Sequence, residues 1–244
     1  MKAMVLAAGL GTRLRPLTDN RPKALVEVAG RTLLDITLSR LRTFGVREVI
    51  INVHHFADLI LKYLETNDNF GMRIEVSCEQ SLLDTGGGLK KAAYFFLEDS
   101  DGPFLVHNVD VVSTIDLRKM LQFHTENEAL ATLAVQDRQT SRHLLFDEKL
   151  QLCGRMFLED LKNEASRSSQ AVQALAFCGI HVISPRLFQL MTERGAFSII
   201  TSYLRLATLG ERILAFRADR WYWRDLGKPE DLLQASEDAK QKLP

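Results

Sequence analysis

The alternation of short apolar runs with amphipathic segments is the feature that most constrains how this chain folds. Residues 3–8, 48–53 and 103–110 are almost continuously apolar, as expected of strands that are buried on both faces. The segments 33–45, 56–67 and 88–98 instead place apolar residues at helical spacing. Strands that alternate with helices at this pitch predict a parallel sheet covered by helices.

The second half of the chain has a less regular pattern. Strands are predicted at 130–136, 174–183 and 212–218, short strands at 143–147 and 151–157, a polar loop at 163–170 and a closing helix at 229–243. We therefore predict a single α/β domain over residues 1–244. Its Rossmann-like, mostly parallel sheet would be flanked by helices, with a small β-rich insertion in the second half.

Charge and cysteine content exclude several classes of protein. The 31 Lys and Arg residues balance 31 Asp and Glu residues, which argues against generic nucleic-acid binding. The three cysteines are widely spaced and give neither a disulfide framework nor a paired metal-ligand spacing. No apolar run approaches the roughly 18 residues that a membrane span needs. We expect a cytoplasmic protein that binds neither nucleic acid nor membrane.

Glycines, cations and carboxylates follow the ends of the predicted strands. Gly9, Gly11 and Arg13 follow the first strand, Glu79 follows the strand predicted at 70–79, and Asp110 ends the strand at 103–110. In open parallel sheets, ligands bind beyond the carboxyl ends of the strands. This combination predicts a site for a phosphate ester and a divalent cation.

The stretch LAAGLGTRLRPLTDNRPKAL (6–25) has competing explanations. A dinucleotide fingerprint needs a third glycine where Leu14 stands, and the GK[ST] of a P-loop is absent, so a nicotinamide-dependent oxidoreductase is disfavoured. A plain structural turn would explain Gly9 and Gly11 but would leave Arg13 and Lys23 without a reason. A loop that binds phosphates accounts for both the glycines and the cations.

The same stretch resembles the signature of the sugar-phosphate nucleotidyltransferases, which join an NTP to a sugar 1-phosphate and release pyrophosphate. The resemblance continues in DTGGGLKKA (84–92), NVD (108–110) and WRDLGKPEDLLQA (223–235), in the same order along the chain. Within the family, the chain looks most like short bacterial members. These use UTP with N-acetylmuramate 1-phosphate, or GTP with mannose or heptose 1-phosphate. We do not expect the C-terminal β-helix of hexapeptide repeats that longer members carry.

The resemblance implies roles for individual residues. Arg13 would grip the triphosphate, Lys23 would contact the reacting phosphates, and Asp110 and Asp225 would hold Mg²⁺. Residues 1–136 would form the nucleotide-binding core, and 137–244 would add the sugar-binding part with the second metal ligand. Arg13, Lys23 and Asp110 would be catalytic. The other expected contacts to the nucleotide are Leu6, Ala7, Ala8, Gly9, Gly11, Thr12, Glu79, Thr85, Gly86 and Gly87, and those to the sugar are Asn108, Gly179 and Glu159.

Several residues leave alternatives open. Glu79 could accept a hydrogen bond from guanine N1–H or from uracil N3–H. Val109 stands where most family members have glycine, so either the backbone is extended there or the site is altered. His54 and His55 point to opposite faces of a strand and cannot easily share a metal, which favours a packing or loop role. Trp223 would line either the sugar pocket or the core.

The resemblance slightly favours UTP with N-acetylmuramate 1-phosphate as substrates. A guanylyltransferase for mannose or heptose 1-phosphate is the alternative, and a cytidylyltransferase ranks third. A non-catalytic nucleotide-sugar sensor is the alternative from another class, and only Val109 supports it. The sequence does not predict the oligomeric state.

Overall fold

The computed structural model describes residues 1–98, 102–157, 162–165 and 172–240. Its main sheet runs in the spatial order β11-β10-β9-β12-β6-β1-β4-β5, and β8 and β13 join it beside β12. These strands are β1 (Lys2–Leu6), β4 (Glu48–Val53), β5 (Arg73–Cys78), β6 (Phe104–Asn108), β8 (Ala131–Gln136), β9 (Arg142–Phe146), β10 (Leu152–Phe157), β11 (Lys162–Ala165), β12 (Gln173–Ile183) and β13 (Ile213–Arg217).

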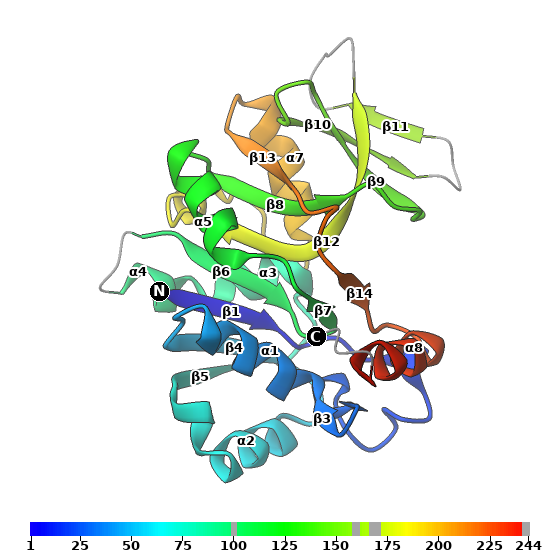
Figure 1. The fold of residues 1–244 in the computed structure, drawn as a ribbon. Helices are drawn as coiled ribbons and strands as arrows, with labels where there is room; N and C mark the ends of the chain where they lie inside the picture. Colours follow the sequence, from blue (N-terminus) through cyan, green and yellow to red (C-terminus); the bar gives the residue numbers. More distant parts are fainter. Residues whose placement is uncertain (99–101, 158–161, 166–171, 241–244) are drawn as a thin grey trace.

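The amino-terminal half supplies the parallel part of this sheet. β1 runs parallel to β4 and β6, with Met4 opposite Ile50 and Val106, and β5 runs parallel to β4. β12 then joins β6 in the antiparallel direction, and β9, β10 and β11 extend the sheet beyond it. The predicted α/β, Rossmann-like fold is therefore confirmed, with the β-rich part at one end of the molecule (Figure 1).

Helices cover both faces because successive strand residues point to opposite sides of the sheet. Val5 and Ile51 pack in one core with the first set of helices, whereas Met4 and Ile50 pack in a second core with the other set. The first set is α1 (Leu33–Thr43), α2 (Ala57–Thr66), α5 (Leu117–Glu126) and α8 (Pro229–Lys240), and the second is α3 (Asp84–Lys91), α4 (Ala93–Leu97), α6 (Leu187–Leu190) and α7 (Ile199–Thr208). Figure 1 shows α1, α5 and α8 in front of the sheet, and α3, α4 and α7 behind it.

The structure corrects three local expectations. The helix expected at 88–98 begins earlier, at Asp84, so Gly86 to Gly88 lie within α3. Helix α7, which Ser198 caps by accepting a hydrogen bond from the N–H of Ile200, was not expected. Residues 163–165 belong to β11 and not to a loop, and 166–170 lie outside the described residues.

A small second sheet completes the region around the carboxyl ends of β1 and β6. β7 (Val111–Ser113) pairs in the antiparallel direction with β14 (Trp223–Asp225), so Asp225 lies opposite Val111. The N–H of Leu226 also donates to the carbonyl oxygen of Asp110 at 2.7 Å. This pairing brings Asp225 beside the end of β6, although the two segments lie far apart in the sequence.

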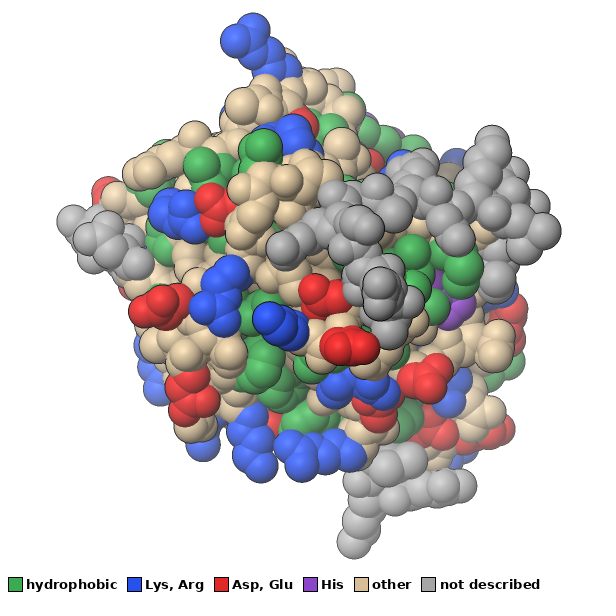
Figure 2. Space-filling view, turned by 90° about the horizontal axis from the view of Figure 1, so that it is seen from above, with side chains coloured by type: hydrophobic (Ala, Val, Ile, Leu, Met, Phe, Trp, Pro, Cys, Tyr) green, Lys and Arg blue, Asp and Glu red, His purple; other side chains and the backbone are tan. Residues whose placement is uncertain are grey.

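The surface carries charges of both signs. On the face seen in Figure 2, Lys and Arg side chains are interspersed with Asp and Glu side chains, which agrees with the net charge of zero. Among the described residues, no helix is both long enough and apolar enough to cross a membrane.

Candidate active site

A cavity of about 190 Å³ opens at the carboxyl ends of β1 and β6. Its lining contains one cationic side chain, Lys23, and two carboxylates, Asp84 and Asp110, and its other residues are uncharged. Parallel strands of one sheet end at the same rim, which explains why segments far apart in the sequence meet there. The lining residues are Leu6, Ala8, Gly9, Lys23, Asn52, Asp84, Thr85, Asn108, Val109 and Asp110.

Lys23 and Asp110 form an ion pair inside this cavity. Nζ of Lys23 donates to Oδ2 of Asp110, and both side chains are largely buried, with relative exposures of 10% and 19%. A short 3₁₀ turn at Lys23–Leu25 presents the lysine, and Asp110 lies just beyond β6. The structure thus brings together two of the three residues that the sequence predicts to be catalytic.

Asp225 adds a second carboxylate beside this pair. Burial and then the nearby Asp110 carboxylate raise the pKa of Asp225, while Lys23, Arg13 and the N–H of Gly227 act in the opposite direction. A Cβ atom at Gly227 would lie 2.5 Å from Oδ1 of Asp225 and 2.7 Å from Nη2 of Arg13. A side chain at position 227 would therefore displace this carboxylate and this guanidinium from their present positions.

The donor chemistry of the two aspartates fits a divalent cation. Burial, and then the Asp110 carboxylate, raise the pKa of Asp225, and a bound cation would offset both effects. Mg²⁺ commonly uses one or two carboxylates and completes its shell with water and substrate phosphates. Among the described residues, no group of three or more His, Cys, Asp and Glu could hold a metal, so the carboxylate pair needs those additional oxygens.

Asn52 lines the cavity and links the end of β1 to Glu79 through hydrogen bonds, and sequence reasoning missed it. Its Oδ1 accepts from the N–H of Ala7 at 2.9 Å, and its Nδ2 donates to Oε1 of Glu79 at 2.7 Å. The other carboxylate oxygen of Glu79 accepts from the N–H of Leu83 at 3.0 Å. An asparagine within the otherwise apolar run VIINV (49–53) was the available signal, because a buried amide needs partners.

The residues of the DTGGG motif divide between two surroundings. Asp84 and Thr85 line the cavity, but the N–H groups of Gly86 and Gly87 both donate to the carbonyl oxygen of Phe197. Thr85 also uses its Oγ1 to accept from the N–H of Ile199 at 3.0 Å. The structure therefore places Gly86 and Gly87 against the segment before α7, away from the cavity lining.

The predicted sugar-binding residues Asn108 and Gly179 lie together. Gly179 has φ of +70°, and a Cβ atom there would lie 2.7 Å from Nδ2 of Asn108. Glu159, the third predicted residue, lies outside the described residues.

Arg138 and Trp223 form a second unit beside Asp225. The Arg138 guanidinium lies 3.8 Å from the Trp223 ring centroid, and its Nη2 donates to the carbonyl oxygen of Phe177. Burial lowers the pKa of Arg138, whereas Cys178 and Asp225 act to raise it. Its Nε is buried without a hydrogen-bond partner, and no carboxylate of the described chain forms an ion pair with it. Trp223 donates from Nε1 to the carbonyl oxygen of Cys178 at 2.7 Å.

The remaining residues raised by the sequence have structural contacts. Val109 does not have positive φ, and its N–H donates to the carbonyl oxygen of Leu6 at 3.1 Å, so the backbone accepts a β-branched residue there. Nδ1 of His54 lies 2.8 Å from the carbonyl oxygen of Glu79, whereas the His55 ring packs on Phe56. Gly11 has φ of +65° and directs the chain into the turn at Thr12–Leu14, which carries Arg13.

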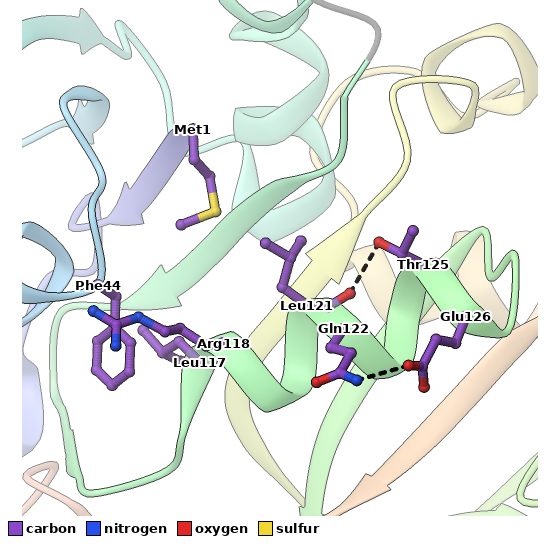
Figure 3. Close-up of a pocket in the computed structure, with 8 residues that line it drawn as sticks. All are labelled: Met1, Phe44, Leu117, Arg118, Leu121, Gln122, Thr125 and Glu126. Atoms are coloured by element: carbon purple, nitrogen blue, oxygen red, sulfur yellow. Dashed lines mark hydrogen bonds between the residues drawn. The ribbon is translucent and has the colours of Figure 1, made fainter.

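A larger cavity, of about 340 Å³, lies at the other end of the sheet, between Met1, Phe44 and α5 (Figure 3). Its lining is mainly apolar. Among its polar side chains, Gln122 donates to Glu126 and Thr125 donates to the carbonyl oxygen of Leu121, both within α5. It has no lysine–aspartate pair of the kind found at the carboxyl ends, and we do not assign the reaction to it.

Comparisons with known proteins agree with this assignment. The family model for nucleotidyl transferases matches residues 2–146. N-acetylmuramate alpha-1-phosphate uridylyltransferase from Caulobacter vibrioides is 34% identical over 96% of this chain and 94% of its own length. Mannose-1-phosphate guanylyltransferase from Mycobacterium tuberculosis is 32% identical over 97% of this chain, which spans only 64% of that relative's length.

Solved structures agree on the fold. The crystal structure of HddC from Yersinia pseudotuberculosis complexed with GMP-PN has a TM-score of 0.76 at 20% identity, over 98% of this chain and 99% of that one. A putative glucose-1-phosphate thymidylyltransferase from Bacillus anthracis has a TM-score of 0.81 at 16% identity, over 98% and 95% of the two chains. At these identities the likeness concerns the fold alone.

Proposed function

The chain belongs to the nucleotidyl transferase family and is a sugar-1-phosphate nucleotidyltransferase, and we propose that it joins UTP to N-acetylmuramate 1-phosphate. The carrying observation is the 34% identity to the Caulobacter uridylyltransferase, which extends over nearly the full length of both chains. The mannose-1-phosphate guanylyltransferases match at similar identity but are longer than this chain. A guanylyltransferase for mannose or heptose 1-phosphate is the second candidate.

The site contains what the reaction requires. An oxygen of the sugar phosphate attacks the α-phosphorus of the NTP in line, and pyrophosphate leaves, so catalysis depends on positioning and on neutralising charge. Lys23 lies beside Asp110 in the cavity and would contact the reacting phosphates. Arg13, near Asp225, would neutralise the triphosphate. Backbone N–H groups around Gly9 would hold phosphate oxygens without obstruction by side chains.

Mg²⁺ is the cation that we propose for Asp110 and Asp225. When bound, it would neutralise phosphate oxygens and orient the triphosphate. The coexistence of both carboxylates with Lys23 and Arg13 also argues against a non-catalytic sensor, which would need no such charge balance. The backbone at Val109, the only support for a sensor, has no positive φ that would demand glycine.

The direct test is pyrophosphate release with Mg²⁺, each of the four NTPs being crossed with a panel of sugar 1-phosphates. The panel includes the 1-phosphates of N-acetylmuramate, N-acetylglucosamine, mannose and heptose. We expect the highest kcat/KM for UTP with N-acetylmuramate 1-phosphate. A preference for GTP with mannose or heptose 1-phosphate would establish the second candidate instead. NTP binding without pyrophosphate release for any pair would favour the sensor.

Arg138 gives a physical reason to expect an acidic sugar. Its guanidinium stacks on Trp223 near Asp225 and pairs with no carboxylate in the described chain. N-acetylmuramate carries a lactyl carboxylate that N-acetylglucosamine lacks, and arginine binds carboxylates by charge-assisted hydrogen bonds. Arg138→Ala should therefore lower kcat/KM for N-acetylmuramate 1-phosphate about 10- to 100-fold, with a much smaller effect on N-acetylglucosamine 1-phosphate.

Comparing the two sugar 1-phosphates distinguishes carboxylate recognition by Arg138 from a structural role of this residue. Arg138 also holds the carbonyl oxygen of Phe177, so a purely structural role would reduce kcat/KM for both sugars by the same factor. Arg142→Ala is the matched control, because Arg142 is an exposed arginine on the neighbouring strand β9. It should leave both values of kcat/KM unchanged. Equal losses in Arg138→Ala would refute carboxylate recognition by this residue.

A further inference from the structure

Asp84 occupies a backbone conformation that is unusual for a residue with a side chain. Its φ is +57°, in the left-handed region that favours glycine and that Asp and Asn tolerate better than other residues. It is the first residue of α3 and lines the candidate active-site cavity together with Thr85 and Asn52. The strained conformation thus keeps an acidic side chain at the cavity, where glycine would fit the backbone more easily.

One carboxylate oxygen of Asp84 remains available to a ligand. Oδ1 accepts from the N–H of Thr85 at 2.6 Å, which fixes the carboxylate relative to α3. Oδ2 has no hydrogen-bond partner, and the side chain forms no ion pair, within the described parts of the chain. Asp84 is exposed at the mouth of the cavity, so leaving this oxygen without a protein partner costs little free energy.

Glu79, the other acidic residue near this edge of the cavity, already uses both of its carboxylate oxygens in hydrogen bonds. Oε1 of Glu79 accepts from Nδ2 of Asn52, and Oε2 accepts from the N–H of Leu83. Glu79 is only 4% exposed. Through Asn52, which also accepts from the N–H of Ala7, these bonds position the backbone at the end of β1. Glu79 has the contacts of a positioning residue, whereas Asp84 has a free acceptor.

We propose that Asp84 selects the nucleotide base by accepting a hydrogen bond from its Watson–Crick edge. This rests on the proposed function, and Leu6, Ala8 and Gly9, three of the expected nucleotide contacts, line the same cavity as Asp84. Ionised carboxylates only accept hydrogen bonds. Uracil N3–H and guanine N1–H are donors at this edge, whereas cytosine N3 and adenine N1 are acceptors. A carboxylate that faces the ring nitrogen of this edge therefore favours UTP or GTP over CTP and ATP, whose only donors there are the exocyclic amines.

Two substitutions at this position separate base selection from backbone strain. Asp84→Gly keeps a backbone that accepts φ of +57° but removes the acceptor, and Asp84→Asn keeps the side-chain shape but adds an N–H donor. Calorimetric titration of the four NTPs without sugar measures base choice independently of turnover. A failure of the proposed sugar would therefore not affect this test.

In Asp84→Gly, the affinity for the preferred nucleotide should fall about 10- to 100-fold, and that for CTP much less. In Asp84→Asn, the affinity for CTP should rise relative to that for UTP. Glu79→Gln is the contrasting variant, because a positioning residue should change the affinity for all four nucleotides by one common factor. Equal losses for all four nucleotides in both Asp84 variants, or no change in either, would overturn the proposal.

Discussion

Asp110→Asn should lower kcat for pyrophosphate release by about 10³-fold or more while the protein remains folded. Asparagine keeps the shape of the side chain but removes the negative charge that faces Nζ of Lys23 and that would help to hold Mg²⁺. Losing a single preorganised charge at such a site typically costs about 10²–10³ in kcat. Here the substitution would remove a proposed metal ligand and the partner of the proposed catalytic lysine together. The measurement is steady-state pyrophosphate release at saturating Mg²⁺ and substrates.

Asp225→Asn should give a comparable loss of kcat but a different effect on stability. Burial and the nearby Asp110 raise the pKa of Asp225, so its ionised form is disfavoured in the folded protein. The neutral amide removes this cost, and the melting temperature without divalent cation should therefore stay level or rise. Asp58→Asn is the matched control, since Asp58 is an exposed residue in the first turn of α2. Near-normal kcat in either Asp110→Asn or Asp225→Asn would refute the metal assignment.

The rim of candidate functional residues could be predicted because it follows from the direction of the parallel strands. One apolar run ends at Gly9, and another ends at Asn108 and Asp110, so the sequence predicts both strands and the residues that follow them. Parallel strands bring these ends to one edge of the sheet. Asp225 depended on the family resemblance, because its place beside Asp110 comes from the pairing of β14 with β7. Such short strands carry too little periodicity to be recognised from sequence.

The contacts within the site were not predictable to the same degree. The glycines of DTGGG suggested a close approach to a ligand, yet Gly86 and Gly87 donate to the carbonyl oxygen of Phe197. That partner precedes α7, a helix whose place against α3 only the tertiary structure defines. Likewise, Asp84 precedes the helix expected at 88–98, and its positive φ appears only in the folded chain.

The Lys23 ammonium group has two partners in the proposed mechanism, the Asp110 carboxylate and the substrate phosphates, and it cannot bind both equally well. In the structure its ammonium group binds Oδ2 of Asp110, a carboxylate that we also propose for the divalent cation. The proposed reaction needs the same ammonium group at the phosphates. Binding of Mg²⁺ and nucleotide would therefore release Lys23 from Asp110 and make it available to the substrate. Lysine suits this exchange because its ammonium is a single charge on a flexible stem.

Lys23→Ala should accordingly lower kcat about 10²- to 10³-fold and change how stability responds to Mg²⁺. Without the cation, the melting temperature should fall, because Asp110 and Asp225 lose the ammonium charge that offsets them. Added Mg²⁺ should raise the melting temperature more in the variant than in the wild type, since no lysine competes for Asp110. The measurement is thermal unfolding with and without MgCl₂, beside the kinetic assay.

Lys228→Ala is the matched control for Lys23→Ala, because the Lys228 side chain is 57% exposed and, within the described residues, forms an ion pair only with the exposed Glu230. Its kcat and its response to Mg²⁺ should equal those of the wild type. If Lys23→Ala kept normal kcat, the ammonium group would not be acting on the phosphates. If instead kcat fell while Mg²⁺ raised both melting temperatures equally, Lys23 would act in the reaction without competing for the cation. The two readouts therefore test separately the two roles that the Lys23–Asp110 pair implies.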